Sequence, residues 1–305
     1  SQYSNRGRTY DYEGENKGEI PDDDVAEPGA GYLWDLARRA HISFRDFGEF
    51  VHEITVNRRH VYVGTKPYID SNVNHDYPYF DLRIPDQRRA DIWLQEFQQY
   101  QQTGGMPALT ILYLPRDHTS GAAAGYVTPK SMVADNDLAL GRVIQALSAS
   151  RFWPSTAVFV LEDDAQDGPD HVDSHRSPLL VISAWNRGGV NHRFTNTTDV
   201  VQTIEEILKL DHLSQFDDFG RPLRDVWADR PDLTPFTALT PAQPLDEQNP
   251  ARTRAAIDSR RLDLSAADRA DMDLFNRVLW RAIKGDSVPY PGPRRMATLE
   301  ARRSR

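Results

Sequence analysis

Six acidic residues and two histidines crowd into residues 161–176, LEDDAQDGPDHVDSHR. The segment directly follows the apolar run TAVFV at 156–160, which is typical of a buried strand. Asp163 and Asp164 are adjacent carboxylates, and in a partly buried position each raises the pKa of the other unless a cation relieves the repulsion. We therefore predict that Asp163 and Asp164 bind a divalent metal. The alternative from composition alone is a solvated acidic turn.

The available ligand types exclude some kinds of metal site but leave several metal ions possible. The chain has no cysteine, so thiolate metal sites and disulfides are excluded. Carboxylate oxygens suit Ca²⁺, Mg²⁺ or Mn²⁺, and an added imidazole opens Zn²⁺ or Fe. An EF-hand is excluded, because a loop starting at Asp164 has His175 at the position that needs a bidentate Glu.

Three histidines follow predicted strands. His118 lies in RDHTSG, directly after the apolar run 108–115, and His192 follows the run 178–185. His171 lies four residues before His175, so the two would share one face if their loop is helical. A surface position for His118 and a local network around His175 are the alternatives to a role in a site.

The apolar runs 108–115, 156–163 and 178–185 predict buried strands. Helical spacing predicts a helix after Asp86, which would cap it, and further helices over 132–150 and from Thr195 or Asn196 to 210. This order indicates an α/β fold with a largely parallel sheet flanked by helices. Ligands bind such sheets at the carboxyl ends of the strands, so the three polar loops are expected to converge there.

The remaining segments divide the chain. Residues 1–30 predict an irregular lead-in, and residues 31–51 a short helix followed by a strand. Residues 52–80 predict an irregular excursion because of their Tyr and Pro clusters. We expect an α/β core over 31–211, then a wrapping segment and a C-terminal helix of the same domain over 212–305.

Composition and absent motifs exclude several classes. The net charge of −9 argues against a nucleic-acid binder, and no apolar run is long enough to predict a membrane span. The chain lacks the GxSxG, P-loop, GxGxxG and HExxH motifs, so an α/β-hydrolase, a P-loop NTPase, a Rossmann dehydrogenase and a zincin protease are unsupported.

Four segments together resemble a known superfamily. They are LPRDHTSG at 114–121, MVADNDLALGRVI at 132–144, FWPSTAVFVLEDDAQDGPDHVDSHRSP at 152–178 and HRFTNTTDVVQTIEEILKL at 192–210. They resemble phosphoesterases of the alkaline phosphatase superfamily, in particular the bacterial branch of non-specific phospholipase C and metal-dependent acid phosphatases. Members of this branch are often fused to a β-propeller.

The resemblance implies roles for individual residues. Asp163 and Asp164 would hold the metal, His118 would contact the phosphoryl group or the leaving oxygen, and His171 would be a second pocket residue. The substrate would be a phosphate mono- or diester, cleaved through a Ser or Thr nucleophile held on the metal.

The resemblance also implies a missing part. In the superfamily, the nucleophile and the first strands precede the region that this chain resembles. We therefore expect this chain to be the C-terminal portion of a larger protein. An N-terminal segment or β-propeller domain of the same gene product, on the same or a separate chain, would complete it. The resemblance and the absence of cysteine predict a periplasmic or extracellular location.

Two other functions fit the same residues. A non-catalytic structural or assembly protein could retain the fold without the nucleophile. A binding domain could use the acidic loop to hold Ca²⁺ without turnover.

Overall fold

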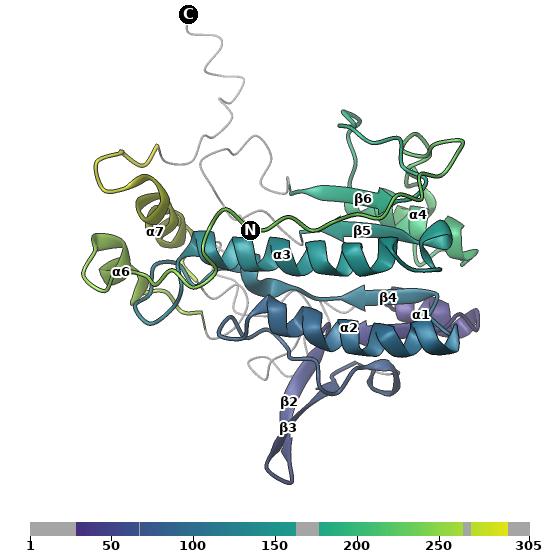
Figure 1. Cartoon of the computed structure of the whole chain (residues 1–305), viewed down its shortest axis with the longest axis horizontal. Helices are drawn as coiled ribbons and strands as arrows, with labels where there is room; N and C mark the ends of the chain where they lie inside the picture. The colour runs from purple at the N-terminus through teal and green to yellow at the C-terminus, as the bar shows by residue number, and fades with distance from the viewer. Residues whose placement is uncertain (1–28, 67, 163–176, 265–269, 292–305) are drawn as a thin grey trace, which may run out of the picture.

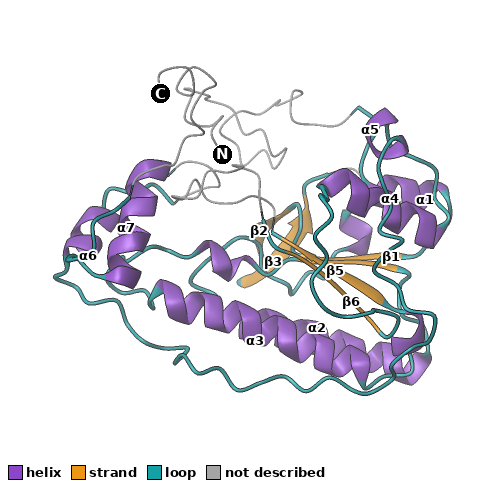
Figure 2. Ribbon diagram, turned by 90° about the horizontal axis from the view of Figure 1, so that it is seen from above, coloured by secondary structure: helices purple, strands orange, loops and turns teal. Residues whose placement is uncertain are grey.

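The computed structural model describes residues 29–66, 68–162, 177–264 and 270–291. Its strands form a layer between two pairs of helices (Figures 1 and 2). The helices α2 (Asp86–Thr103) and α3 (Pro129–Ser148) cover one face. The helices α1 (Leu33–Arg39) and α4 (Thr197–Leu208) cover the other. The α/β class predicted from the sequence is confirmed.

The strands pair in three sets of two. β1 (Phe44–Phe47) and β4 (Leu109–Leu112) are parallel, whereas β5 (Ala157–Leu161) and β6 (Leu179–Ser183) are antiparallel. In the described residues, β1 and β4 are the only strands that pair parallel, whereas the sequence predicts a largely parallel sheet. The physical reason is the connection, because parallel neighbours need a crossover such as the helix that separates β1 from β4. β5 and β6 instead pair antiparallel along their whole length, from Ala157 opposite Ser183 to Leu161 opposite Leu179.

Both faces of the parallel pair are buried. Phe47 and Leu112 pack with the residues of α2 and α3, whereas Phe44 and Leu109 pack with those of α1. This alternation explains why β4 has a continuous apolar sequence, as strands covered on both faces do.

The long helices begin differently from the prediction. Pro85 precedes α2 as its N-cap, and Asp86 is the first helical residue with its side chain buried. Gly104 ends α2 in the left-handed conformation with φ 81°. Thr128 caps α3, its hydroxyl accepting a hydrogen bond from the Ser131 N–H, so this helix starts before residue 132.

The predicted irregular excursion contains a β-hairpin. β2 (Val51–Val56) and β3 (Arg59–Gly64) pair antiparallel, and Asn57 and Arg58 turn the chain with φ values of 50° and 66°. Two left-handed residues are typical of a two-residue hairpin turn. Figure 1 shows this hairpin projecting away from the helices.

The segment after α4 wraps the molecule. It forms α5 (Gln215–Asp218), then runs along α3, where Ser148 Oγ accepts from the Phe236 N–H at 2.8 Å and Ser131 Oγ donates to the Pro244 carbonyl at 2.6 Å. It ends in α6 (Arg254–Ser259) and α7 (Met272–Lys284) beside the start of α3 (Figure 2). The short 3₁₀ helices are η2 (Asp70–Asn72), η3 (Pro115–His118) and η4 (Trp153–Ser155). Among the described residues, no helix has the length and apolar character to cross a membrane.

Candidate active site

The strand β4 leads directly into η3, which carries His118. The Tyr113 N–H donates to the Phe47 carbonyl at 3.0 Å, and the Tyr77 hydroxyl donates to the Tyr113 carbonyl at 2.7 Å. The first bond extends the pairing of β1 and β4 past the end of β4, and the second fixes the Tyr113 carbonyl. His118 therefore lies at the carboxyl end of a parallel strand, where ligands bind in open α/β sheets.

One hydrogen bond fixes the tautomer of His118. Its Nδ1 lies 3.0 Å from the Thr119 carbonyl oxygen. A carbonyl can only accept, so Nδ1 carries the proton in the neutral ring and Nε2 carries the lone pair. Phe80 and Phe275 flank the ring, with centroid distances of 5.2 Å and 5.7 Å. The imidazole is thus half-buried and oriented, with Nε2 able to accept or return a proton.

The residue after His118 is strained. Thr119 is buried and has φ 62° and ψ 164°, a conformation that a β-branched residue rarely adopts. Its N–H donates to the Arg116 carbonyl at 3.1 Å, and its hydroxyl accepts from the Gly121 N–H at 3.2 Å. Strain of this kind persists only where the surroundings enforce it, and it concentrates at functional sites.

A buried ionic network anchors η3. Arg116 Nη1 donates to Asp135 Oδ2 at 3.0 Å, and the Arg116 N–H donates to Asp86 Oδ2 at 3.0 Å. Asp135 Oδ2 also accepts from the Asp86 N–H at 2.7 Å, and Asp86 Oδ1 accepts from Arg89 Nη1 at 3.0 Å. The network therefore ties the first turn of α2 and the second turn of α3 to the segment that holds His118.

Burial raises the pKa of Asp86 to about 6, against the opposing pull of Arg89 and of the hydrogen bonds from Arg116 and Asn136. The guanidinium group of Arg89, the Arg116 N–H and the Asn136 side-chain amide thus compensate a carboxylate that has no exposed surface. Breaking one partner would leave a buried charge without compensation.

Asn136 joins the network to Asp117. Its Nδ2 donates to the Leu114 carbonyl at 2.7 Å and to Asp86 Oδ2 at 3.1 Å, and lies 3.4 Å from Asp117 Oδ1. Asp135 and Asn136 lie past the first turn of α3, and their side chains hold the segment that follows β4.

The neighbouring strand β1 carries a second buried carboxylate. Asp46 pairs with Ile111 in the parallel ladder and is fully buried, and the backbone N–H groups of Gly48 and Glu49 face its carboxylate. Burial, with Glu49 nearby, raises its pKa to about 8. Asp46 is therefore mostly protonated at neutral pH.

The predicted metal ligands Asp163 and Asp164 and the predicted pocket residue His171 lie outside the described residues. The structure does place the strand that leads to them. β5 ends on the same side of the molecule as β4, the side of α6 and α7 (Figure 1). The Ser177 hydroxyl donates to the Glu162 carbonyl at 3.0 Å, which brings the two ends of segment 163–176 together.

His192 lies on the opposite side. Because β6 is antiparallel to β5, the residues after β6 leave from the other end of the strands, the α4 end in Figure 1. Asn196 there caps α4 in a reciprocal pair with Asp199, with N–H···O distances of 3.0 Å and 3.2 Å. The prediction that all three polar loops meet at one edge of the sheet is therefore wrong for the loop of His192.

One group among the described residues has the donors and spacing for a metal ion. It comprises Glu205, His212 and Asp217, whose ligand atoms lie within 4.8 Å of one another. These residues belong to the α4 end, away from His118. The sequence assigned no chemistry to His212, because its partners are spread over a helix, a loop and a second helix.

The comparison with protein families agrees with the fold. A model of the Phosphoesterase family matches residues 13–211. The chain belongs to the Phosphoesterase family. No curated protein gives a significant match to the chain. The family match covers η3 with His118 and the segment of Asp163, Asp164 and His171, and the family indicates phosphoester hydrolysis.

Sequence reasoning missed the residues that hold η3 in place. Arg89 and Arg116 are almost fully buried, although charged side chains are rarely buried unless they are paired. The available signal was the placement of Asp86 and Asp135 at the starts of two predicted helices. Nothing in their spacing showed that both would turn toward one arginine.

Proposed function

We propose that this member of the Phosphoesterase family hydrolyses phosphate mono- or diesters at the carboxyl ends of β4 and β5. The observation that carries the proposal is His118, an oriented imidazole at the end of a parallel strand, held by a strained residue and a buried ionic network. The family match supports the reaction class. Membership in the branch of phospholipase C and acid phosphatases, and fusion to a β-propeller, remain part of the proposal.

Asp163 and Asp164 are the proposed metal ligands. Two adjacent carboxylates after a strand have the donor chemistry that a hard divalent cation requires. A divalent metal bound there would neutralise charge on the phosphoryl oxygens and lower the pKa of the attacking hydroxyl. The donor set is compatible with Ca²⁺, Mg²⁺, Mn²⁺, Zn²⁺ or Fe, and this range is kept in the proposal.

His118 is the proposed proton-transfer residue. With Nδ1 donating to the Thr119 carbonyl, a protonated Nε2 can give its proton to the leaving oxygen of the ester. The flanking rings of Phe80 and Phe275 limit water around the imidazole. His171 is proposed as a second pocket residue on the strength of the sequence resemblance alone.

The nucleophile is proposed to be a Ser or Thr supplied from outside this chain. In the described residues β4 pairs only with β1 and β5 only with β6, so one edge of each strand has no partner. Leu161 and Leu180 in the second pair are 41% and 48% exposed. A segment of the same gene product that adds strands here would both cover these side chains and bring in the nucleophile.

The test is hydrolysis of a chromogenic phosphodiester and a chromogenic phosphomonoester by the complete gene product, before and after a chelator. The proposal expects turnover of at least one substrate, its loss on chelation and its recovery with one of the divalent metals. Metal binding without any turnover would instead support a binding domain. Absence of both would support a structural protein with the same fold. We further propose a periplasmic or extracellular location, which fractionation of the source cells would test.

A further inference from the structure

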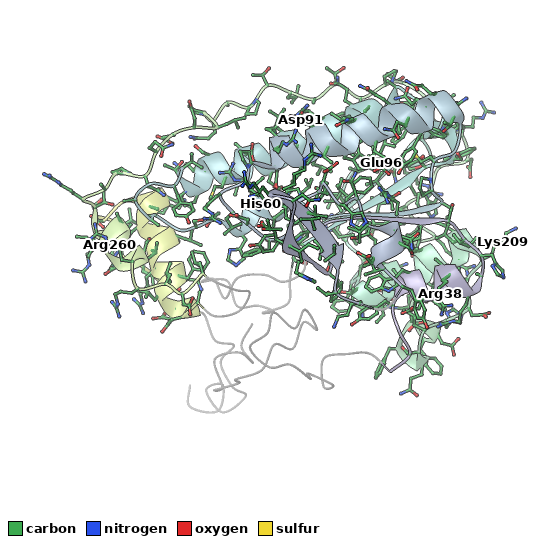
Figure 3. All side chains as sticks on the ribbon, turned by 90° about the horizontal axis from the view of Figure 1, so that it is seen from below. Arg38, His60, Asp91, Glu96, Lys209 and Arg260 are labelled. Carbon is green, nitrogen blue, oxygen red and sulfur yellow. The ribbon has the colours of Figure 1, made fainter. Side chains whose placement is uncertain are left out.

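The loop after α4 gathers three metal-binding side chains. Glu205 lies in the last turn of α4, His212 in the loop and Asp217 in α5. Lys209, with φ 57°, ends the helix and turns the chain back toward it. Figure 3 shows Lys209 at the end of the molecule opposite Arg260 of α6, and His118 lies at the α7 side. This cluster is therefore separate from the candidate active site.

The distances suit a small cation. His212 Nδ1 lies 2.8 Å from Glu205 Oε2 and 3.8 Å from Asp217 Oδ2. Donors around a tetrahedral metal with bonds of about 2.1 Å are roughly 3.3 Å apart. The two distances bracket that value, so small side-chain rotations would place all three donors around one ion.

One buried carboxylate oxygen of the cluster lacks a hydrogen-bond donor. The Glu205 side chain is completely buried, and its Oε1 has no hydrogen-bond partner in the described part of the chain. Within the same residues, neither Glu205 nor Asp217 forms an ion pair with Lys or Arg. A buried carboxylate oxygen without a donor is costly and rare in folded proteins, and a cation would satisfy it.

The surrounding groups orient the ligands. Asp217 accepts from the Leu213 N–H at 2.7 Å and from the Ser214 N–H at 2.9 Å, which fixes its carboxylate. On the far side of the imidazole, His212 Nε2 lies 3.6 Å from Asp218 Oδ1. A carboxylate facing the second ring nitrogen is the usual partner of a metal-binding histidine.

We infer that Glu205, His212 and Asp217 form a structural site for a divalent transition metal of the Zn²⁺ type. His212 binds through Nδ1, and the Asp218 carboxylate faces the Nε2–H group at 3.6 Å. The imidazole favours Zn²⁺ over Mg²⁺ and Ca²⁺, which prefer oxygen donors. The bound ion fastens the loop and α5 to the end of α4. This inference is independent of the proposed catalytic activity.

The test is thermal unfolding of the chelator-treated chain with Zn²⁺ or Mg²⁺ added, together with the metal content after dialysis. At metal concentrations well above Kd, the inference expects Zn²⁺ to raise the wild-type Tm by about 5 °C, and by more than Mg²⁺ raises it. His212→Ala should lose the rise, and Asp218→Asn should weaken Zn²⁺ binding about 10-fold or more.

Two controls separate this site from others. His192→Ala removes an exposed histidine at the same end and should keep the rise. Asp163→Asn/Asp164→Asn removes the proposed catalytic ligands and should keep it too. A wild-type chain without a Zn²⁺-dependent rise would overturn the inference, and so would a rise of equal size in His212→Ala. The first result would leave His212 as a partner of Glu205 in an ion pair alone.

Discussion

At His118, one hydrogen bond decides which ring nitrogen can reach a substrate. The Thr119 carbonyl takes the Nδ1 proton, and the left-handed backbone of Thr119 is what turns that carbonyl toward the ring. A β-branched residue in this conformation is costly, so its presence beside the imidazole argues that the orientation matters. The role of His118 can be separated from its contribution to stability.

Replacing His118 with Ala should lower phosphoesterase turnover of the complete gene product by about 10²-fold or more, because proton transfer to a leaving group contributes at least that much. The Tm should change little, since the ring is only half-buried. Steady-state kinetics and thermal unfolding measure the two effects. His192→Ala is the matched control and should retain wild-type turnover. A His118→Ala enzyme with unchanged kcat would remove His118 from the proposed mechanism.

Asp46 predicts a pH dependence of stability. Its folded pKa of about 8 lies above the ordinary value of 3.8, so between these values the folded state holds a proton that the unfolded state has lost. The contribution of Asp46 to the free energy of unfolding therefore falls as pH rises through that window, and it levels off above pH 8. An Asn side chain at this position cannot ionise, so the free energy of unfolding does not fall in this way.

Asp46→Asn should accordingly gain stability relative to wild type between pH 5 and pH 9, by more than about 1 kcal/mol. Urea unfolding at both pH values measures the difference. Asp137→Asn, at an exposed position of α3, should show no such gain. An equal effect of Asp46→Asn at pH 5 and pH 9 would show that Asp46 is already ionised in the folded protein.

At the scale of elements, Arg116 joins three parts of the fold. Its side chain pairs with Asp135 of α3, and its N–H binds Asp86 of α2, while its own backbone forms η3. Arg116 touches no proposed substrate group. It acts as a positioning residue, through the segment that carries His118.

Arg116→Leu should destabilise the protein by about 3–5 kcal/mol, because it leaves the buried carboxylate of Asp135 without its ion-pair partner. The fitting control is Arg142→Leu, which removes a more exposed ion pair to Asp91 of 2.6 Å and should cost no more than about 1 kcal/mol. Denaturant unfolding compares the two. Similar losses in both variants would contradict the buried network as an anchor.

The sequence predicted most elements by periodicity. The apolar spacing indicated segments that overlap the helices α1, α2, α3, α4 and α7 and the strands β1, β4, β5 and β6. The hairpin of β2 and β3 was missed because half of its residues are exposed and its apolar residues do not alternate regularly with polar ones. The direction of β6 was also hidden, since strand direction depends on the path of residues 162–178 and not on the strand sequence.

The site was predictable only in outline. The position of His118 followed from a polar residue after an apolar run, a local signal. The network of Asp86, Arg116 and Asp135 depends on contacts between segments far apart in the chain, which spacing does not encode. The cluster of Glu205, His212 and Asp217 needs the turn at Lys209 to bring its members together.

At the scale of the whole molecule, the two strand pairs lie on one helical layer. Phe47 and Leu112 of the first pair and Val158 and Ile182 of the second all pack with the residues of α2 and α3. The facing strands β4 and β5 nevertheless share no hydrogen bonds in the described residues. Exposed strand edges are open to pairing with another segment.

Co-expression with the proposed N-terminal segment should therefore stabilise this chain and raise its phosphoesterase turnover. Strand addition would cover Leu161 and protect the backbone amides of β5 from hydrogen exchange. Exchange measured by mass spectrometry, with and without that segment, compares peptides of β5 with those of the hairpin β2–β3 as an internal control. Equal exchange of β5 in both samples would argue against an added strand.

The central claim is phosphoester hydrolysis at the end of β5, where Asp163 and Asp164 are the proposed metal ligands. Its most direct test compares the rate at which the complete gene product and its Asp163→Asn/Asp164→Asn variant hydrolyse a chromogenic phosphodiester, both loaded with the same divalent metal. The account predicts that the variant loses at least about 10²-fold in kcat/KM while keeping the wild-type Tm before metal is added. Equal rates for the two proteins would contradict it.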